Sequence, residues 1–391
     1  MNKELLKKIK LLPDVIASIF YLRFYKLLSP WFNIKPKRVQ IALTYQCNSR
    51  CIMCNIWKMK EFSKISVKNW NKILNDPIFS EIKYIDITGG EALLHPDFTD
   101  LINIFVKKLP KLKKINLVSN GFLTSKSKKN LESLISYLDR KEIALGIAVS
   151  LDGYGKMHEE IRGIPQAFEK VSQTLSDLKK LQDQYPNFTI YVGILIMKKN
   201  LNKTQKLTDW LEKNNFKYGF QIVGFHDSYI RNLDTKNEID FSKKDEEKLF
   251  KFLKEKKKAK DIVDFYSYYW ADLLSMYRDK NKRTTPCPFL QDSFAVDALG
   301  DIYYCFSSKA IGNIFNHKKE INKNSVSQIY FNPENKIKRK EMWQKDCANC
   351  NSGCDINVAL AADFKKYFWF RLTGKIMPRL SDIFKKKNAK K

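Results

Sequence analysis

The sequence predicts an α/β fold, because strand-like and helix-like segments alternate from residue 39 to residue 225. Apolar runs of strand length recur along this stretch, and segments with helical periodicity separate them. Such alternation is typical of βαβ units, which build a parallel sheet with right-handed crossovers. Six units are too few to close an eight-stranded barrel, so we expect a partial (β/α)6, TIM-like barrel.

The expected elements can be placed from their periodicity. The strands are expected at residues 39–45, 84–88, 114–119, 144–151, 188–197 and 219–225. The helices are expected near residues 67–74, 98–109, 125–138, 167–181 and 203–213. Ligands of such sheets bind at the carboxyl ends of the strands. We therefore expect functional residues in the loops that follow the strands.

Three cysteines, Cys47, Cys51 and Cys54, follow the first expected strand in a C-x3-C-x2-C spacing. Thiolates select iron–sulfur clusters, zinc or copper(I). A closed structural zinc site needs four protein ligands, and the nearest histidine in the sequence is His95. Three thiolates on a four-iron cluster would leave one iron open to a small molecule. From the spacing alone, ordinary cysteines or half of a zinc site remain alternatives.

Small and polar residues follow the next three expected strands. The chain reads Thr-Gly-Gly-Glu at residues 88–91, Ser-Asn-Gly at 119–121 and Ser-Leu-Asp-Gly at 150–153. Paired glycines let a backbone approach a ligand closely, and Glu91 can accept hydrogen bonds from an ammonium group. Each stretch alone is typical of a turn. Their succession beside the cysteine loop favours a binding site.

Positive charge gathers at both ends of the chain, whose formal net charge is +29. In residues 1–38 and 361–391 Lys and Arg far outnumber Asp and Glu, and large apolar residues such as Trp31 and Trp369 lie among them. This mixture suits amphipathic helices on an anionic membrane surface. Helices packed on their own domain are the main alternative. Nucleic-acid binding is the least favoured interpretation.

The expected compartment is the cytoplasm. The chain is too long and too poor in cysteine to need a disulfide framework, and its basic N-terminus is no convincing secretory signal. The uncharged stretch at residues 15–22 is too short to span a bilayer. Peripheral attachment to the inner face of the membrane stays open.

A second group of cysteines lies in the C-terminal part of the chain. Residues 294–304 are typical of a β-hairpin that turns at Leu299-Gly-Asp, which would bring Cys287 and Cys305 close together. The run from Cys347 through Cys350 to Cys354 has a C-x2-C-x3-C spacing. A four-cysteine zinc site is an alternative, because C-x2-C pairs also occur in zinc knuckles.

These patterns divide the chain into five expected regions. They are a basic amphipathic segment (1–38), the barrel core (39–225), a helical linker region (226–286), a small α+β domain with the second cysteine group (287–360) and a basic amphipathic tail (361–391).

The barrel core resembles the radical S-adenosylmethionine (SAM) superfamily. The resemblance rests on five motifs in order: the cysteine loop, the GGE motif at residues 89–91, Ser-Asn-Gly at 119–121, Ser-Leu-Asp at 150–152, and an H-x3-RG motif from His158 to Gly163. Met53 and Ala92 replace an aromatic residue and a proline that are frequent in the family, and neither change removes a ligand. The second cysteine group resembles the SPASM/twitch domains that follow many such cores, in the shorter, twitch-like form.

The resemblance implies two kinds of iron–sulfur site. Cys47, Cys51 and Cys54 would bind a [4Fe–4S] cluster whose fourth iron is chelated by SAM. An auxiliary [4Fe–4S] cluster would use Cys287, Cys305, Cys347 and Cys350, with Cys354 as the alternative ligand. The residues expected to contact SAM are Gly89, Gly90 and Glu91 at its amino end, Ser119 and Asn120 beside them, Ser150 and Asp152 at its ribose, Arg162 at its carboxylate, and residues 192–197 beside its adenine.

The implied activity is reductive cleavage of SAM to a 5′-deoxyadenosyl radical, which abstracts hydrogen from a substrate. The electron donor would be a reduced flavodoxin- or ferredoxin-type protein. The basic ends favour a membrane-associated substrate, such as a small or lipid-linked molecule, while SPASM-type relatives suggest a peptide or protein. A non-catalytic iron–sulfur or zinc protein that binds nucleic acid is the remaining alternative. No catalytic side chain is assigned from the sequence.

Overall fold

The computed structural model divides the chain into two compact units. The barrel unit comprises residues 35–241 and 292–340, and the helical unit comprises residues 1–34, 242–291 and 341–391. The structure describes residues 32–63, 65–258, 264–287, 292–316, 320–321, 325–354 and 363–376, together with positions 20, 24, 28, 356 and 360. The predicted regions 1–38 and 361–391 therefore lie largely outside the described residues.

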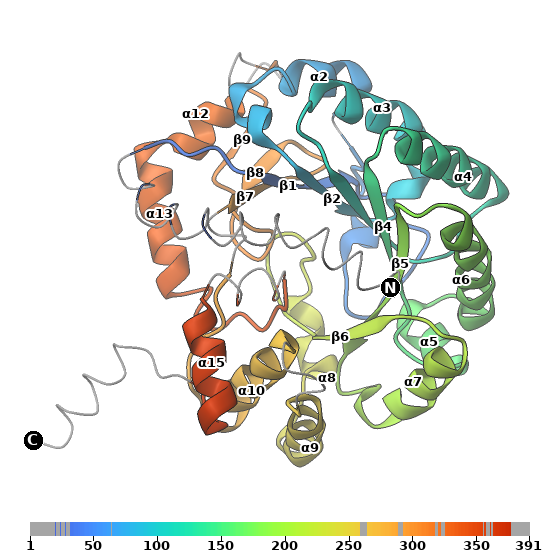
Figure 1. Ribbon diagram of the computed structural model, residues 1–391, viewed down its shortest axis with the longest axis vertical. Coiled ribbons are helices and arrows are strands. Elements are labelled where there is room, and N and C mark those ends of the chain that lie inside the picture. Colours follow the sequence, from blue (N-terminus) through green and yellow to red (C-terminus); the bar gives the residue numbers. More distant parts are fainter. Residues whose placement is uncertain are drawn as a thin grey trace, which may run out of the picture. The chain divides into compact units, whose positions relative to one another are not determined.

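The strands described in the barrel unit form one sheet in the order β6-β5-β4-β3-β2-β1-β7-β8-β9. Neighbouring strands from β1 to β6 pair in parallel, and Figure 1 shows them curving as part of a barrel. The strands are β1 (Arg38–Thr44), β2 (Tyr84–Gly89), β3 (Lys114–Ser119), β4 (Ala144–Ser150), β5 (Phe188–Ile196), β6 (Tyr218–Ile222), β7 (Ser293–Val296), β8 (Asp301–Tyr303) and β9 (Gly312–Asn313).

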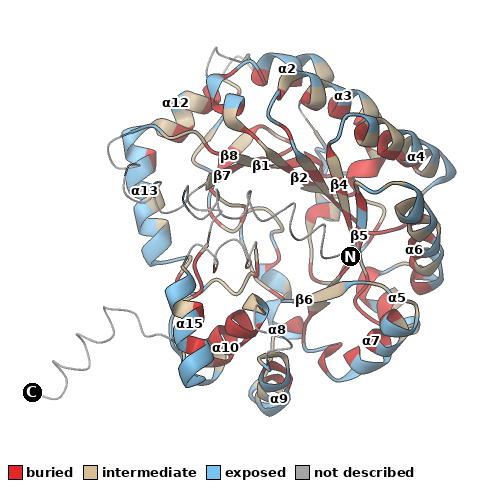
Figure 2. Ribbon diagram, in the orientation of Figure 1, coloured by how far each residue is buried: buried red, intermediate tan, exposed pale blue. Residues whose placement is uncertain are grey.

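Helices cover the outer face of this sheet, as the alternation predicted. In β4, Leu145, Ile147 and Val149 are buried while the residues between them are partly exposed, so one face of the strand packs against the helices. In Figure 2 the helices carry their buried residues on the side that faces the sheet. They are α2 (Val67–Ile73), α3 (Phe98–Lys108), α4 (Ser125–Arg140), α5 (Lys156–Arg162), α6 (Ala167–Gln184), α7 (Thr204–Lys213) and α8 (Lys236–Ile239).

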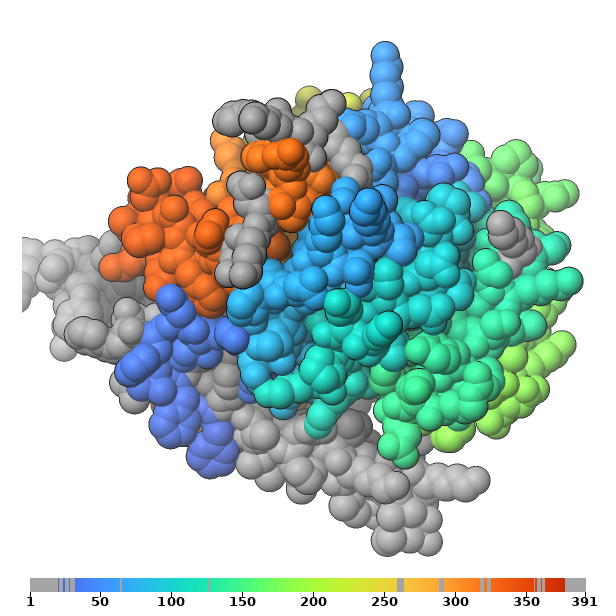
Figure 3. All heavy atoms as spheres, turned by 90° about the horizontal axis from the view of Figure 1, so that it is seen from above, coloured from blue at the N-terminus to red at the C-terminus, as the bar shows by residue number. Residues whose placement is uncertain are grey.

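The predicted partial barrel is confirmed, and element bounds differ from the expected ones by a few residues. Figure 3 shows side chains from α2 to α4, coloured blue through teal, forming one continuous surface. Helix α5 was not predicted, because the H-x3-RG motif was identified as a motif and not as a helical turn. It ends at Gly163, whose φ of +65° is the left-handed conformation that commonly terminates helices.

The predicted hairpin at residues 294–304 is confirmed, but it extends the barrel sheet. Strands β7 and β8 are antiparallel, and the turn between them places Gly300 at a φ of +89°. Strand β7 also pairs in parallel with β1, from Arg38 opposite Ser293 to Ile41 opposite Val296. The hairpin and Cys305 therefore belong to the barrel unit, as do α12 (Ser325–Phe331) and the part of α13 (Pro333–Gln344) up to Lys340.

The helical unit is built around α10 (Phe265–Arg278), together with α9 (Glu246–Lys256) and α15 (Phe364–Thr373). Tyr268, Tyr269 and Trp270 of α10 are buried, and the Tyr268 ring meets Phe370 of α15 edge to face at 5.6 Å. In the described part of the chain, no helix is both long and apolar enough to cross a membrane.

Candidate functional site

The three cysteines of the first group line one cavity at the carboxyl ends of the barrel strands. Cys51 is buried and Cys47 and Cys54 are partly buried. The cavity has a volume of about 140 Å³. The other residues around it are Ser49, Met53, Ile56, Trp57, Thr88, Gly89, Gly90, Val118, Ser119, Asn120, Ser150 and Arg162. The fold thus brings the residues that follow the first four strands to one place.

The two glycines at the end of β2, Gly89 and Gly90, are required by the close backbone of residues 44–46. A Cβ on Gly89 would lie 2.3 Å from the carbonyl oxygen of Thr44, and one on Gly90 would lie 2.2 Å from that of Gln46. The Gly90 N–H donates to the Thr44 carbonyl at 2.7 Å. Any side chain here would push the cysteine loop away from β2.

Glu91 joins the loop after β2 to the loop after β3. Its carboxylate is buried and accepts hydrogen bonds from the Asn120 N–H at 2.7 Å and from the Ser119 hydroxyl at 3.2 Å. Burial raises the pKa of Glu91 to about 7, although these hydrogen bonds oppose the rise. The Asn120 side chain continues to the cysteine loop, donating to Asn48 Oδ1 at 2.7 Å and to Cys47 Sγ at 3.8 Å.

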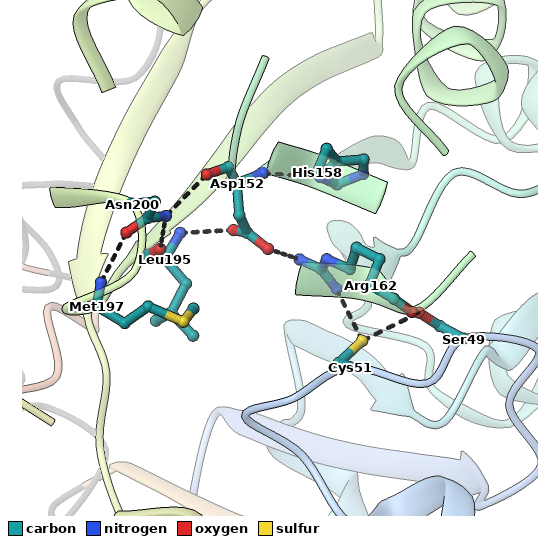
Figure 4. A network of polar contacts seen from close by, with 8 residues as sticks. All are labelled: Ser49, Cys51, Asp152, His158, Arg162, Leu195, Met197 and Asn200. Carbon is teal, nitrogen blue, oxygen red and sulfur yellow. Dashed lines mark hydrogen bonds and ion pairs between the residues drawn. The ribbon is translucent and has the colours of Figure 1, made fainter. Parts of the chain in front are cut away.

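Arg162 and Asp152 form a buried ion pair beside Cys51 (Figure 4). Arg162 Nη2 lies 2.6 Å from Asp152 Oδ2, and Nη1 donates to Cys51 Sγ at 3.5 Å. Ser49 Oγ is 3.0 Å from the same sulfur. From the family resemblance we expected Asp152 to contact the ribose of SAM and Arg162 to contact its carboxylate. In the structure Asp152 is fully buried and does not line the cavity described above, whereas Arg162 does.

The remaining contacts in Figure 4 hold Asp152 in place. Its Oδ1 accepts from the Leu195 N–H at 2.8 Å, and its carbonyl accepts from Asn200 Nδ2 at 2.7 Å. Its N–H donates to His158 Nδ1 at 3.1 Å. Burial lowers the pKa of His158 well below its ordinary value, so this imidazole is neutral and acts as an acceptor.

The segment after β6 is hydrogen-bonded to the cysteine loop by residues that the sequence analysis did not identify. Asn232 is fully buried, and its side-chain amide donates to the carbonyls of Met53 and Gly224, each at 3.0 Å. The Asn55 N–H donates to the Ile230 carbonyl at 3.0 Å. These asparagines lie outside the recognised motifs, so only a family alignment could have pointed to them.

In the helical unit, α10 holds the two segments that carry Cys287 and Cys347–Cys354. Asp272 accepts from the N–H groups of Thr284 and Thr285, at 2.9 and 2.6 Å. Tyr269 donates from its hydroxyl to the Asn351 carbonyl at 2.6 Å.

Arg283, which is buried, joins these two segments. It donates to the carbonyls of Thr285, Cys350 and Ser352 at 2.9, 3.1 and 2.7 Å. Burial lowers its pKa, but the charges of Cys350 and Cys287 outweigh this and raise the pKa above its ordinary value. Two cysteines of the second group thus lie near this buried cation.

The cysteine loop of the barrel unit fits an iron–sulfur cluster, because its three thiols line one cavity. In a four-iron cluster each thiolate binds a different iron, so its ligands surround a volume. Burial raises the pKa of Cys47 to about 11 and of Cys54 to about 12, so both thiols keep their protons until metal binding displaces them.

Comparison with known proteins agrees with this geometry. Residues 41–211 match the model of the radical SAM superfamily. AlbA, the antilisterial bacteriocin subtilosin biosynthesis protein of Bacillus subtilis, is 26% identical over 73% of this chain, and the match spans only 59% of AlbA. GTP 3′,8-cyclase of Campylobacter jejuni is 26% identical over 75% of this chain and 94% of its own length.

Among solved structures, Streptococcus suis SuiB bound to its precursor peptide SuiA shares the fold. The TM-score is 0.54 at 14% identity, over 89% of this chain and 77% of SuiB. The cysteine loop, the strand-end residues and the family match agree that residues 41–211 resemble a radical SAM domain, a family whose cofactors are a [4Fe–4S] cluster and SAM.

Proposed function

We propose that the chain is a radical SAM enzyme that abstracts hydrogen from a peptide substrate. The observation that carries the radical chemistry is the single cavity in which Cys47, Cys51 and Cys54 meet the residues after β2, β3 and β4. The peptide substrate is supported by the names of two relatives, a bacteriocin biosynthesis protein and a killing-factor maturation protein, SkfB. The SuiB complex with a precursor peptide supports only the compatibility of the fold.

The residues around the cavity have distinct roles in this proposal. Cys47, Cys51 and Cys54 hold the cluster, and when bound, the cluster and SAM together supply a 5′-deoxyadenosyl radical by one-electron cleavage of the sulfonium. Gly89 and Gly90 offer a backbone without side chains to the amino end of SAM, and Ser119, Asn120 and Ser150 offer polar groups.

Two further groups of residues orient SAM and keep the cavity dry. Arg162 Nε is buried without a hydrogen-bond partner among the described residues, so a donor remains for the carboxylate of SAM. Glu91 and Asp152 act from behind the cavity by holding Ser119, Asn120 and Arg162. The side chains of Met53, Ile56 and Val118 make part of the lining apolar, which excludes water from a reactive intermediate.

We also propose that the second cysteine group binds one auxiliary [4Fe–4S] cluster through Cys287, Cys305, Cys347 and Cys350, with Cys354 as the alternative ligand. The contacts of Arg283 and α10 with the segments that carry Cys287 and Cys350 support a built site. About eight iron per chain is expected for two clusters. About four iron and one zinc would favour the zinc alternative.

A peripheral membrane position for a cytoplasmic enzyme is the finer part of the proposal. Helix α15 buries Tyr367 and Phe370 but exposes four large apolar side chains: Phe364, Phe368, Trp369 and Leu372. Lys and Arg residues lie among them, as membrane-surface helices require. Replacing Phe368 and Trp369 by serine should reduce flotation with anionic vesicles, whereas Ile337→Ser, on an exposed position of α13, should not. Equal flotation of both variants contradicts membrane contact.

SAM cleavage tests the proposed activity directly. Anaerobically reconstituted protein with a chemical reductant, or with reduced flavodoxin as donor, should convert SAM to 5′-deoxyadenosine. Absence of this product from protein fully loaded with iron contradicts the activity. Candidate precursor peptides, a lipid-linked sugar and GTP should then be compared for substrate-dependent products. Turnover of GTP but no peptide would contradict the proposed substrate class.

A further inference from the structure

A cation and a hydroxyl group converge on the sulfur of one proposed cluster ligand, Cys51. We propose that Arg162 and Ser49 set the reduction potential of the cluster through this sulfur, and that Asp152 is the positioning residue that holds Arg162 there. The inference rests on the proposed cluster at Cys47, Cys51 and Cys54. It gives Arg162 a role beyond recognition of SAM.

The geometry divides the guanidinium between two partners. Nη2 faces Asp152 Oδ2 at 2.6 Å while Nη1 faces Cys51 Sγ at 3.5 Å. The position of the Asp152 carboxylate is fixed, because its other oxygen, Oδ1, accepts a hydrogen bond from the Leu195 N–H of β5. Figure 4 shows Asp152 on one side of Arg162 and Cys51 on the other. The carboxylate therefore orients the cation toward the sulfur.

The second donor reaches the sulfur independently of this ion pair. Ser49 Oγ lies 3.0 Å from Cys51 Sγ and is buried with it. A hydrogen bond to a ligating sulfur, or a positive charge beside it, stabilises the reduced cluster because reduction adds one negative charge. Both groups should therefore raise the potential, whereas the negative charge of Asp152 should lower it. The Arg162–Asp152 pair need not stabilise the fold, because the desolvation of two buried charges costs much of the free energy that their attraction provides.

The backbone holds the cysteine loop without help from the Arg162 side chain. The Arg50 N–H donates to the Arg162 carbonyl at 2.8 Å, and the Ile52 N–H donates to the Ile161 carbonyl at 3.0 Å. The Ser49 hydroxyl has one proton, which it donates either to the Arg162 carbonyl at 3.0 Å or to Cys51 Sγ at 3.0 Å. A side-chain substitution at Arg162 leaves the two backbone contacts available, so the variant can report on electrostatics.

The test is a redox titration of the full-length protein, followed by electron paramagnetic resonance. The relevant signal is the one that changes when SAM is added and that is missing from a variant with Cys47, Cys51 and Cys54 replaced by alanine. Arg162→Gln should make reduction at least tenfold less favourable, a shift of about 59 mV to more negative potential for one electron. Ser49→Ala should shift the potential in the same direction by a smaller amount.

Asp152→Asn separates an electrostatic role from a structural one. It leaves the Arg162 cation without its counter-charge, so the potential should become less negative, opposite in sign to the shift of Arg162→Gln. Arg38→Gln is the matched control, because Arg38 also pairs with an aspartate, Asp86, at 2.8 Å. Arg38 begins β1 whereas the cysteine loop follows its end, about 20 Å along a strand of this length. Its variant should keep the wild-type potential.

Several outcomes would overturn the inference. One is an unchanged reduction potential in an Arg162→Gln variant that is fully loaded with iron. Another is an equal negative shift in Arg162→Gln and Asp152→Asn, which would indicate that both substitutions only loosen the structure around the cluster. If Arg162→Gln does not retain a cluster, Ser49→Ala decides, and a wild-type potential in that variant contradicts the proposal. A wild-type protein with no SAM-sensitive cluster signal contradicts the proposed function itself.

Discussion

The two cysteine regions each place a buried arginine near their thiols, but they use it differently. In the barrel unit Arg162 points its guanidinium at a carboxylate and at a sulfur, Cys51. In the helical unit Arg283 donates to three backbone carbonyls of the segments that carry Cys287 and Cys350. Arginine thus contacts a cysteine sulfur in one region and backbone carbonyls in the other.

The difference follows from what else supports each cysteine segment. The barrel cysteines follow β1 and are fastened to the ends of β2 and α5 by backbone hydrogen bonds. The segment around Cys350 follows α13 and pairs with no strand in the described residues, so side chains must satisfy its carbonyls. Because backbone hydrogen bonds hold the barrel cysteines, the Arg162 side chain can contact a sulfur, whereas Arg283 is occupied with backbone carbonyls.

Removing each set of cysteines should give the sharpest contrast. Replacing Cys47, Cys51 and Cys54 by alanine should abolish formation of 5′-deoxyadenosine, because no open iron remains for SAM. Replacing Cys347 and Cys350 should lower the iron content by about half and leave substrate-independent SAM cleavage measurable. Chromatography of the nucleoside and iron analysis on the same samples check both. Loss of SAM cleavage in both variants would contradict independent roles.

Loss of Arg283 should destabilise the helical unit strongly. Arg283→Ala leaves one buried and two partly buried carbonyls without their charged donor, which we expect to cost on the order of 3–5 kcal/mol of unfolding free energy. The matched control is Arg278→Ala, whose exposed pair with Asp279 is worth less than about 1 kcal/mol. Denaturant unfolding measures the difference. If the two variants are equally stable, Arg283 does not hold the loop.

The barrel region should depend on pH through Glu91. The folded-state pKa of about 7 lies above the ordinary value of 4.5, so folding favours the neutral carboxyl. Its contribution to stability, about 3 kcal/mol at most, is complete below pH 4.5 and is lost as pH rises through 7. Glu91→Gln should flatten this decline in unfolding free energy between pH 5.5 and 8, and the exposed control Glu132→Gln should not. Parallel curves for wild type and Glu91→Gln would refute the assignment.

Gly90→Ala should produce a smaller loss, of about 1–3 kcal/mol, by overpacking against the Gln46 carbonyl. The displaced cysteine loop should also lower iron occupancy. Gly193 of β5 provides the control, since a Cβ there meets no atom within 4 Å. Thermal unfolding and iron analysis compare the two variants, and similar results for both would mean that the close approach has no energetic importance.

The strand ends were predictable because their signals are local. Alternation of apolar segments located β1 to β5 to within one residue of their observed starts. The pairing of β7 with β1 was not predictable, because it joins residues about 250 positions apart and the local pattern around residue 294 indicates only a hairpin. The buried Asn232 was missed for a related reason: a single asparagine carries no periodic signal.

The sequence by itself determined where the thiolates, glycines and polar strand ends lie, since spacing and periodicity depend on neighbours along the chain. The tertiary structure decided what each buried polar group meets. It paired Arg162 with Asp152 and Cys51, gave Glu91 to Ser119 and Asn120, and set Arg283 against backbone carbonyls. The physical reason is that a buried charge must find its partner in three dimensions, among residues that the chain brings together only when it folds.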